Sequence, residues 1–180
     1  RPMEGTAETV RKYLQDPEFL FFLGNTDPKK NTPGTLKAYA EYVRAPKSRC
    51  RCWSQIGEQP AEAILREIGE PRLRGMLRLA GYIPNSDLPA IYNEASAFLY
   101  TSLRESFGNS AARSMACGTP VVTSNTSAIP EVAGPGAILV DRFTDGDRRR
   151  LLRLETDPAF RAEQVAYGLE RVKLFSWEQT

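Results

Sequence analysis

The sequence contains no histidine and only three cysteines among its 180 residues. Without histidine, the side chain that most often serves as a general base near neutral pH is missing. Cys50 and Cys52 are too close together for an ordinary disulfide, and one further cysteine does not complete a disulfide framework. A structural zinc site usually takes four Cys or His ligands. We therefore expect buried free thiols in a reducing cytoplasm, and no metal site.

Long apolar stretches and a strong net charge are also missing. No apolar run approaches the roughly 18 residues that span a membrane, and residues 1–5 have no apolar signal region. The net charge of +2 argues against a nucleic-acid-binding surface. The local exception is the basic run at 148–153. It fits a solvated helix face, and the alternative is peripheral contact with the inner face of an anionic membrane.

Short apolar runs alternate with segments of helical periodicity along the chain. Strands are expected at 19–23, 49–57, 76–80, 97–100, 120–123 and 137–140. Residues 49–57 alternate polar and apolar side chains, which indicates one polar face and a place nearer a sheet edge. Helical spacing appears at 8–14, 35–43, 61–68, 88–95, 111–116 and from 157 onward. This alternation predicts an α/β fold, a parallel sheet with helices on both faces.

Three helix boundaries carry recognisable signals. Asp157 and Pro158 are typical of an N-cap followed by a first-turn proline. Gly118 stands where a helix C-terminal glycine belongs. Ser86 or Asp87 is the expected N-cap of the helix at 88–95.

Four polar loops follow predicted strands, at 24–32, 81–87, 101–110 and 123–131, and ligands bind such sheets beyond the carboxyl ends of the strands. Gly24 and Gly108 allow close approach to the backbone. The loop at 101–110 enters a helix whose unpaired N–H groups and dipole suit a diphosphate. Lys29 and Lys30 suit charge on a departing diphosphate, and Glu105 can accept from sugar hydroxyls. The ordinary alternative is that these three are surface charges, with Glu105 complementing the helix dipole.

Three segments in the second half carry a family resemblance: Glu105-Ser106-Phe107-Gly108, Met115-Ala116-Cys117-Gly118-Thr119-Pro120-Val121-Val122 and Ile129-Pro130-Glu131. Their order and spacing resemble the group 1 glycosyltransferases, which are retaining enzymes of the GT-B fold. Segments at 24–31, 81–88 and 175–178 extend the likeness. The resemblance implies that residues 17–180 form the Rossmann-like, donor-binding C-terminal half of a GT-B enzyme. Residues 1–16 would be a linker or first helix that follows an N-terminal domain.

The resemblance also implies roles for individual residues. Lys30 would contact the donor diphosphate and Glu105 the hydroxyls of the donor sugar, as the catalytic pair. The backbone near Tyr82 and Ile83 would lie against the nucleobase. The implied donor-binding set is Gly24, Asn25, Tyr82, Ile83, Leu88, Ser106, Phe107, Gly108, Asn109 and Arg113. No metal and no cofactor are implied, because the helix terminus and the lysine carry the charge of the leaving group.

The implied reaction transfers a sugar from a UDP- or GDP-sugar to an acceptor hydroxyl with retained configuration. The residues at 29–31 and 123–127 resemble the corresponding segments of mannosyltransferase-like members of the family. The acceptor, a glycan or a lipid, would be bound through the N-terminal half. We therefore expect no measurable transfer by this chain alone, because half of a cleft neither orients an acceptor nor excludes water.

Two positions depart from the family pattern. Arg113 stands eight residues after Glu105, where the family often has a second glutamate that bonds the ribose hydroxyls. Arginine has five donors and no acceptor, so it cannot take those protons. Asn25 stands where many members have an arginine for the diphosphate. These departures support an alternative, a degenerate GT-B domain that acts as a scaffold or regulatory partner. A GT-B epimerase or phosphorylase is disfavoured by the segment at 105–108.

Overall fold

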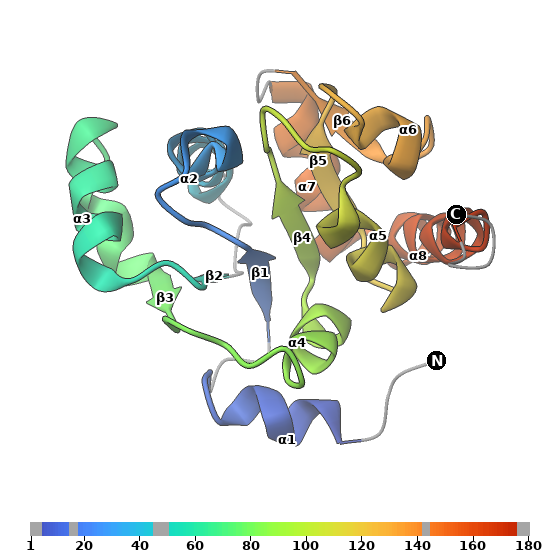
Figure 1. Ribbon diagram of the computed structural model, residues 1–180, viewed down its shortest axis with the longest axis horizontal. Coiled ribbons are helices and arrows are strands. Elements are labelled where there is room, and N and C mark those ends of the chain that lie inside the picture. Colours follow the sequence, from blue (N-terminus) through green and yellow to red (C-terminus); the bar gives the residue numbers. More distant parts are fainter. Residues whose placement is uncertain (1–4, 15–17, 45–50, 142–144, 176–180) are drawn as a thin grey trace.

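The computed structural model describes residues 5–14, 18–44, 51–141 and 145–175. Within them, six strands form one sheet in the order β3-β2-β1-β4-β5-β6, and every neighbouring pair is parallel. The strands are β1 (Phe19–Phe22), β2 (Arg51–Ser54), β3 (Leu77–Leu79), β4 (Ala97–Tyr100), β5 (Val121–Ser124) and β6 (Ile138–Val140). The predicted parallel α/β sheet is confirmed (Figure 1).

Helical segments connect the strands. They are α1 (Thr6–Arg11), η1 (Pro28–Lys30), α2 (Thr32–Val43), α3 (Glu58–Glu67), η2 (Pro71–Met76), α4 (Leu88–Glu94), α5 (Asn109–Ala116), α6 (Ile129–Ala133), α7 (Asp145–Thr156) and α8 (Pro158–Val172). The helix expected at 8–14 begins two residues earlier and ends at Arg11, and it packs against α4. In the part of the chain described here, none of the helices combines the length and the apolar character that a membrane span needs.

The core lies in two layers, one on each face of the sheet. Side chains alternate along a strand, so Leu20 and Phe22 face one layer while Phe19 and Phe21 face the other. Helices α2, α3 and α7 cover the first face, and α1, α4, α5 and α6 cover the second. Because both faces are covered, β1 is apolar at every position and fully buried, as expected of a central parallel strand.

The strand order reverses between β1 and β4. From β1 the chain adds β2 and β3 on one side, and from β4 it adds β5 and β6 on the other. The connections that leave β1 and β4 therefore lead to opposite faces, and a crevice forms beyond the carboxyl ends of these two strands. Strand β2 lies one place in from the edge, which β3 occupies.

The helix-boundary predictions have mixed outcomes. Asp157 accepts a hydrogen bond from the Phe160 N–H at 3.0 Å, with Pro158 as the first helical residue, so this cap is confirmed. Gly118 is left-handed after α5, with φ of 76°. Asp87 is the N-cap residue of α4, as expected, but its side chain makes no capping hydrogen bond. Its carboxylate instead accepts from the Tyr13 hydroxyl at 2.5 Å, a partner 74 residues away that no local pattern indicates.

Candidate functional site

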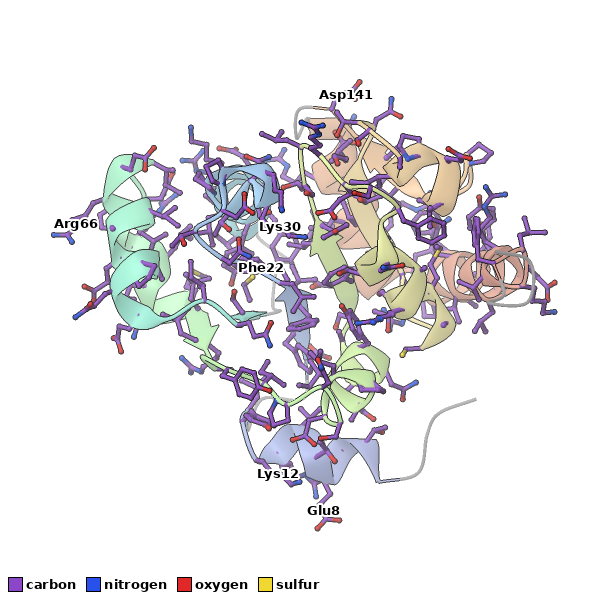
Figure 2. The ribbon with its side chains drawn as sticks, viewed as in Figure 1. Glu8, Lys12, Phe22, Lys30, Arg66 and Asp141 are labelled. Carbon is purple, nitrogen blue, oxygen red and sulfur yellow. The ribbon has the colours of Figure 1, made fainter. Side chains whose placement is uncertain are left out.

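The loop after β1 is shaped by a compact set of local bonds. The Asp27 carboxylate accepts from the Lys29 N–H at 3.0 Å and caps η1, whose first residue is Pro28. This backbone hydrogen bond lowers the pKa of Asp27. Asn31 ends η1 in the left-handed region, with φ of 52°, a conformation that asparagine tolerates better than most residues. The loop thereby presents Lys30 just beyond Phe22, the last residue of β1 (Figure 2).

Lys30 forms an ion pair with Glu105, a residue from the loop after β4. The Lys30 Nζ and Glu105 Oε1 atoms are 2.7 Å apart, and the two side chains are 22% and 15% exposed. The two residues are 75 positions apart in sequence. The fold therefore brings together the two residues that the family resemblance named as a pair.

Glu105 has further partners. The Ser102 hydroxyl donates to Glu105 Oε1 at 2.7 Å, and the hydroxyl of Tyr100 also lowers the pKa of this carboxyl group. Burial favours the neutral acid, but the bonds from Lys30, Ser102 and Tyr100 outweigh burial and hold the pKa of Glu105 below its ordinary value. The carboxylate is therefore ionised at neutral pH and acts only as an acceptor.

The main chain of Glu105 is held by a loop on the other side. Its N–H donates to the Ser127 hydroxyl at 3.3 Å, and the same hydroxyl donates to the Glu105 carbonyl oxygen at 2.8 Å. Ser127 lies in the loop between β5 and α6 and is left-handed, with φ of 57°. Both the carboxylate and the backbone of Glu105 are therefore fixed by tertiary contacts.

The loops after β1 and β4 are bonded to each other as well. The Leu103 N–H donates to the Lys29 carbonyl oxygen at 2.7 Å, and the Asn31 amide donates to the Thr101 carbonyl oxygen at 3.0 Å. The buried hydroxyls of Thr35 and Thr101 are 2.7 Å apart. Because these bonds join the two loops, the ion pair sits on one supported unit.

Helix α5 begins directly beside this unit. Gly108 is its N-cap residue, with φ of 102°, and no side chain caps the helix. A Cβ at Gly108 would meet no atom closer than 3.9 Å, so the backbone conformation, rather than lack of space, requires glycine. The N–H groups of the first turn and the positive end of the helix dipole are therefore open to an anion.

The β3–α4 connection and the first residue of α4 carry three of the predicted donor-binding residues. The Tyr82 side chain is 82% exposed, whereas Ile83 and Leu88 are buried and pack in the second core layer. The Ile83 carbonyl oxygen accepts from the Gln55 amide at 3.3 Å. Only the backbone and the Tyr82 ring can therefore face a ligand here.

Some of the remaining predicted donor-binding residues are exposed, and others are engaged in packing or in local hydrogen bonds. Ser106 and Asn109 are exposed, and the Phe107 ring meets the Phe175 ring edge-on, with centroids 5.5 Å apart. A Cβ at Gly24 would collide with the Phe22 ring, so this glycine serves packing. The Asn25 side chain accepts from the Asp27 N–H at 3.0 Å and is used within its own loop.

Arg113 lies on the exposed surface of α5. Burial raises the pKa of Tyr92, and the charge of Arg113 acts in the opposite direction. Arg113 thus places a positive charge on the surface of α5, where the family pattern has a carboxylate.

Two residues that hydrogen-bond to Glu105 were not predicted, Ser102 and Ser127. Ser102 follows the carboxyl end of β4, where a hydroxyl is a recognisable signal in a parallel sheet. Ser127 has no comparable signal, because its contact depends on how the loop after β5 folds back.

A cleft of about 510 Å³ opens next to the two bonded loops. It lies between α2 and the carboxyl ends of β4, β5 and β6, and its lining includes Asn31, Lys37, Thr101, Leu103 and Thr126. Among the residues that the structure describes, no group of three or more Cys, Asp or Glu side chains is placed to hold a metal ion.

The basic run at 148–153 forms part of α7. Arg150 donates to the Ala137 carbonyl oxygen at 3.5 Å, and Arg153 forms an ion pair with Asp157 at 2.9 Å. The Arg153 guanidinium also lies 4.1 Å from the centroid of the Phe160 ring. Arg150 and Arg153 are thus engaged in contacts within the protein.

The family model described as glycosyl transferases group 1 matches residues 7–171. The chain is 33% identical over 162 residues to O-antigen chain mannosyltransferase B of Escherichia coli, covering 89% of this chain and 42% of the relative. It is 33% identical over 187 residues to the D-inositol 3-phosphate glycosyltransferase of Thermobifida fusca, covering 97% of this chain and 43% of the relative. The chain thus spans less than half the length of these relatives.

Solved structures show the same fold. Sucrose-phosphate synthase of Thermosynechococcus elongatus superposes with a TM-score of 0.75 at 25% identity, over 99% of this chain and 46% of that one. An Anabaena protein in complex with UDP and glucose superposes with a TM-score of 0.72 at 16% identity, over 96% of this chain and 48% of that one. The predicted fold class, the Rossmann-like C-terminal half of a GT-B enzyme, is confirmed.

Proposed function

This chain belongs to the group 1 glycosyltransferases, and we propose that it is the half that binds a nucleotide-diphosphate sugar for transfer to an acceptor hydroxyl with retention. The observation that carries the proposal is the Lys30–Glu105 pair, whose charged atoms are 2.7 Å apart at the carboxyl ends of β1 and β4. This is the switch point of the sheet, where ligands bind in such folds.

The two members of the pair suit the two ends of such a donor. The Lys30 ammonium can move from Glu105 to a phosphate oxygen and stabilise the charge that develops as the diphosphate departs. The Glu105 carboxylate, ionised because its pKa is lowered, then accepts from sugar hydroxyls. The first turn of α5, which Gly108 leaves without a side-chain cap, adds backbone donors for the diphosphate.

The names of the relatives point to mannose as the sugar that is transferred. The relatives include O-antigen chain mannosyltransferase B and the serotype-specific mannosyltransferases of Escherichia coli. The Anabaena structure holds UDP and glucose. We therefore propose GDP-mannose as the first donor to test and UDP-glucose as the second. The acceptor, a glycan or a lipid at the inner face of the membrane, would bind through the half that this sequence lacks.

Titration calorimetry with GDP-mannose, UDP-glucose, GDP, UDP and ADP tests the proposal. We expect saturable binding of at least one of these ligands, and weaker binding by a Lys30→Met variant. Circular dichroism and a cooperative thermal transition establish that both proteins are folded. If the folded wild-type chain binds none of the five ligands at millimolar concentration, the proposal is wrong.

One observation favours a second candidate, a degenerate domain that acts as a scaffold or regulatory partner. Arg113 supplies only donors where a ribose-binding carboxylate would stand, and it lies on the exposed surface of α5. A lost hydrogen bond to a charged group typically costs about 1.5–3 kcal/mol, which is roughly tenfold or more in affinity. A chain that binds no nucleotide until Arg113 is replaced by glutamate would support this second candidate.

A further inference from the structure

We propose that Ser127 is a positioning residue of this site, whose hydroxyl clamps the backbone of Glu105 and so fixes the carboxylate before a donor arrives. The inference rests on the proposed function, because it assumes that Glu105 contacts the donor sugar. Ser127 comes from the loop between β5 and α6, 22 residues after Glu105 in the sequence.

The backbone of Glu105 depends on side chains for its support. Glu105 lies in a stretch of chain that is neither helix nor strand, so its N–H and C=O groups need partners outside a ladder of backbone bonds. The Ser127 hydroxyl serves both groups. It accepts from the Glu105 N–H at 3.3 Å and donates to the Glu105 carbonyl oxygen at 2.8 Å. One side chain therefore holds, at two points, the residue that carries the carboxylate.

The ordinary explanation is that Ser127 only serves its own loop. A serine in a turn usually bonds to its own backbone or to that of a near neighbour. The two bonds of Ser127 instead reach a residue 22 positions earlier, in a different loop. Ser127 is also exposed, so it does not fill the core. These contacts therefore favour a role in supporting Glu105.

Ser127 holds a backbone conformation that serine adopts rarely. Its φ of 57° lies in the left-handed region, which is unfavourable for a residue with a Cβ atom. Among the described residues other than glycine, positive φ occurs at Asn31 and Ser127. Asn31 directly follows Lys30 in the chain, and Ser127 bonds to Glu105. The two unusual residues thus border the two members of the pair, and such conformations concentrate at functional sites.

The loop that carries Ser127 is short and fixed at both ends. Ser124 ends β5, and its hydroxyl donates to the Ser102 carbonyl oxygen, to which the Thr126 hydroxyl also donates at 3.2 Å. Ile129, the first residue of α6, is fully buried, and α6 packs against α5. Ser127 therefore has little freedom, and the clamp takes its geometry from β5 and α6.

A fixed backbone at Glu105 favours donor binding. A carboxylate on a loose loop would have to be ordered when the sugar binds, and this loss of entropy would weaken the complex. The carboxylate itself is held by Ser102 and Lys30, but Lys30 leaves it when the ammonium turns to the diphosphate. The bonds from Ser127 do not involve the carboxylate, so they persist through this change. Ser127 therefore keeps Glu105 in place when its side chain loses a partner.

Two substitutions separate this role from an effect on folding. Ser127→Ala removes the hydroxyl and keeps a Cβ atom in the left-handed region, whereas Ser127→Gly removes both the hydroxyl and the strain. Thermal melts should therefore show Ser127→Gly to be the more stable of the two. Thr156→Ala is the control for the loss of an exposed hydroxyl. Thr156 ends α7, and its hydroxyl donates to the Leu152 carbonyl oxygen at 3.0 Å.

The first readout is hydrogen exchange of the Glu105 amide, measured by NMR in the free chain. Loss of its acceptor should make this amide exchange several times faster in both Ser127 variants, with no change in Thr156→Ala. The amides of β1 and β4 should keep their wild-type rates, which would show that the fold is intact. A serine that served only its own loop would leave the Glu105 amide unaffected. A wild-type rate at this amide in both Ser127 variants would overturn the proposal.

The second readout is calorimetry with GDP-mannose or UDP-glucose, whichever the wild-type chain binds. We expect about threefold to tenfold weaker binding by both Ser127 variants, the range for the loss of one intramolecular hydrogen bond, and no change in Thr156→Ala. The proposal requires the two Ser127 variants to bind alike although their melting temperatures differ. A purely structural role would make affinity follow melting temperature.

Affinities that follow melting temperature, or that stay within about twofold of wild type, would overturn the proposal. A wild-type chain that binds no nucleotide would overturn the proposed function alone. The exchange rate of the Glu105 amide, which needs no ligand, would then still decide whether Ser127 holds this residue.

Discussion

Replacing Lys30 with methionine removes the positive charge of the candidate pair and keeps most of the side-chain length. Lys29→Met is the matched control, because it changes the same charge at the adjacent position. The Lys29 side chain is 54% exposed and faces Asp27 at 3.1 Å, whereas Lys30 is 22% exposed and faces Glu105 at 2.7 Å. The two variants therefore differ in which carboxylate loses its partner.

The size of the effect on stability follows from the exposure of the pair. Exposed ion pairs contribute about 0.2–1 kcal/mol, and breaking a fully buried pair costs about 3–5 kcal/mol. Glu105 is 15% exposed and keeps its bond from Ser102, so we expect Lys30→Met to cost about 1–2 kcal/mol. For a chain of this length that lowers Tm by roughly 2–8 °C. Lys29→Met should stay within about 0.5 kcal/mol of wild type.

The pH dependence has a definite sign. The folded-state pKa of Glu105 is lowered, so the stability it contributes is present above its ordinary value of 4.5 and is lost as pH falls through the folded pKa. In Lys30→Met the main lowering influence is gone and burial remains, so the carboxylate no longer stabilises the fold in that way. The difference in Tm between wild type and Lys30→Met should therefore be largest at neutral pH and shrink in acid.

Thermal melts from pH 7 to below the folded-state pKa of Glu105 and calorimetry with the donor panel measure these effects. Removing a charge-assisted bond to phosphate should weaken donor binding about tenfold to a hundredfold in Lys30→Met, and Lys29→Met should bind within a few-fold of wild type. The reasoning is refuted if the two variants behave alike, or if the difference in Tm between wild type and Lys30→Met does not change with pH.

Two further predictions concern α5. Arg113→Glu supplies the acceptor that the ribose hydroxyls lack, and we expect roughly tenfold tighter binding of a nucleoside diphosphate. Calorimetry checks this against Arg113→Gln, and weaker binding would show instead that Arg113 is itself a ligand contact. Gly108→Ala forces an L-residue to adopt φ of 102°, which should cost about 1–2 kcal/mol in chemical denaturation. Gly75→Ala, at a glycine without positive φ, is the control, and equal losses in both would contradict the explanation.

Much of the fold could be predicted because its signals are local. The apolar run of β1, the cap at Asp157 and the terminating glycine at Gly118 each report a property of a few neighbouring residues. Asp87 shows the limit of this reasoning. Its position before α4 was predicted correctly, but its carboxylate bonds to Tyr13 rather than to the helix, because a phenol brought near by α1 competes for the same acceptor.

The candidate site shows the same limit, because the sequence indicates its residues but not the contacts between them. Glu105, Gly108 and Lys30 could be named from the sequence because they stand in short segments that resemble a known family. That Lys30 and Glu105 touch, across 75 residues, follows only from the tertiary structure. The strand order places β1 beside β4, and the loops that leave these strands must then meet. The contact of Ser127 with Glu105 depends likewise on the pairing of β4 with β5. Local propensity determines which segments form strands and helices, whereas the pairing of the strands decides which distant side chains share a site.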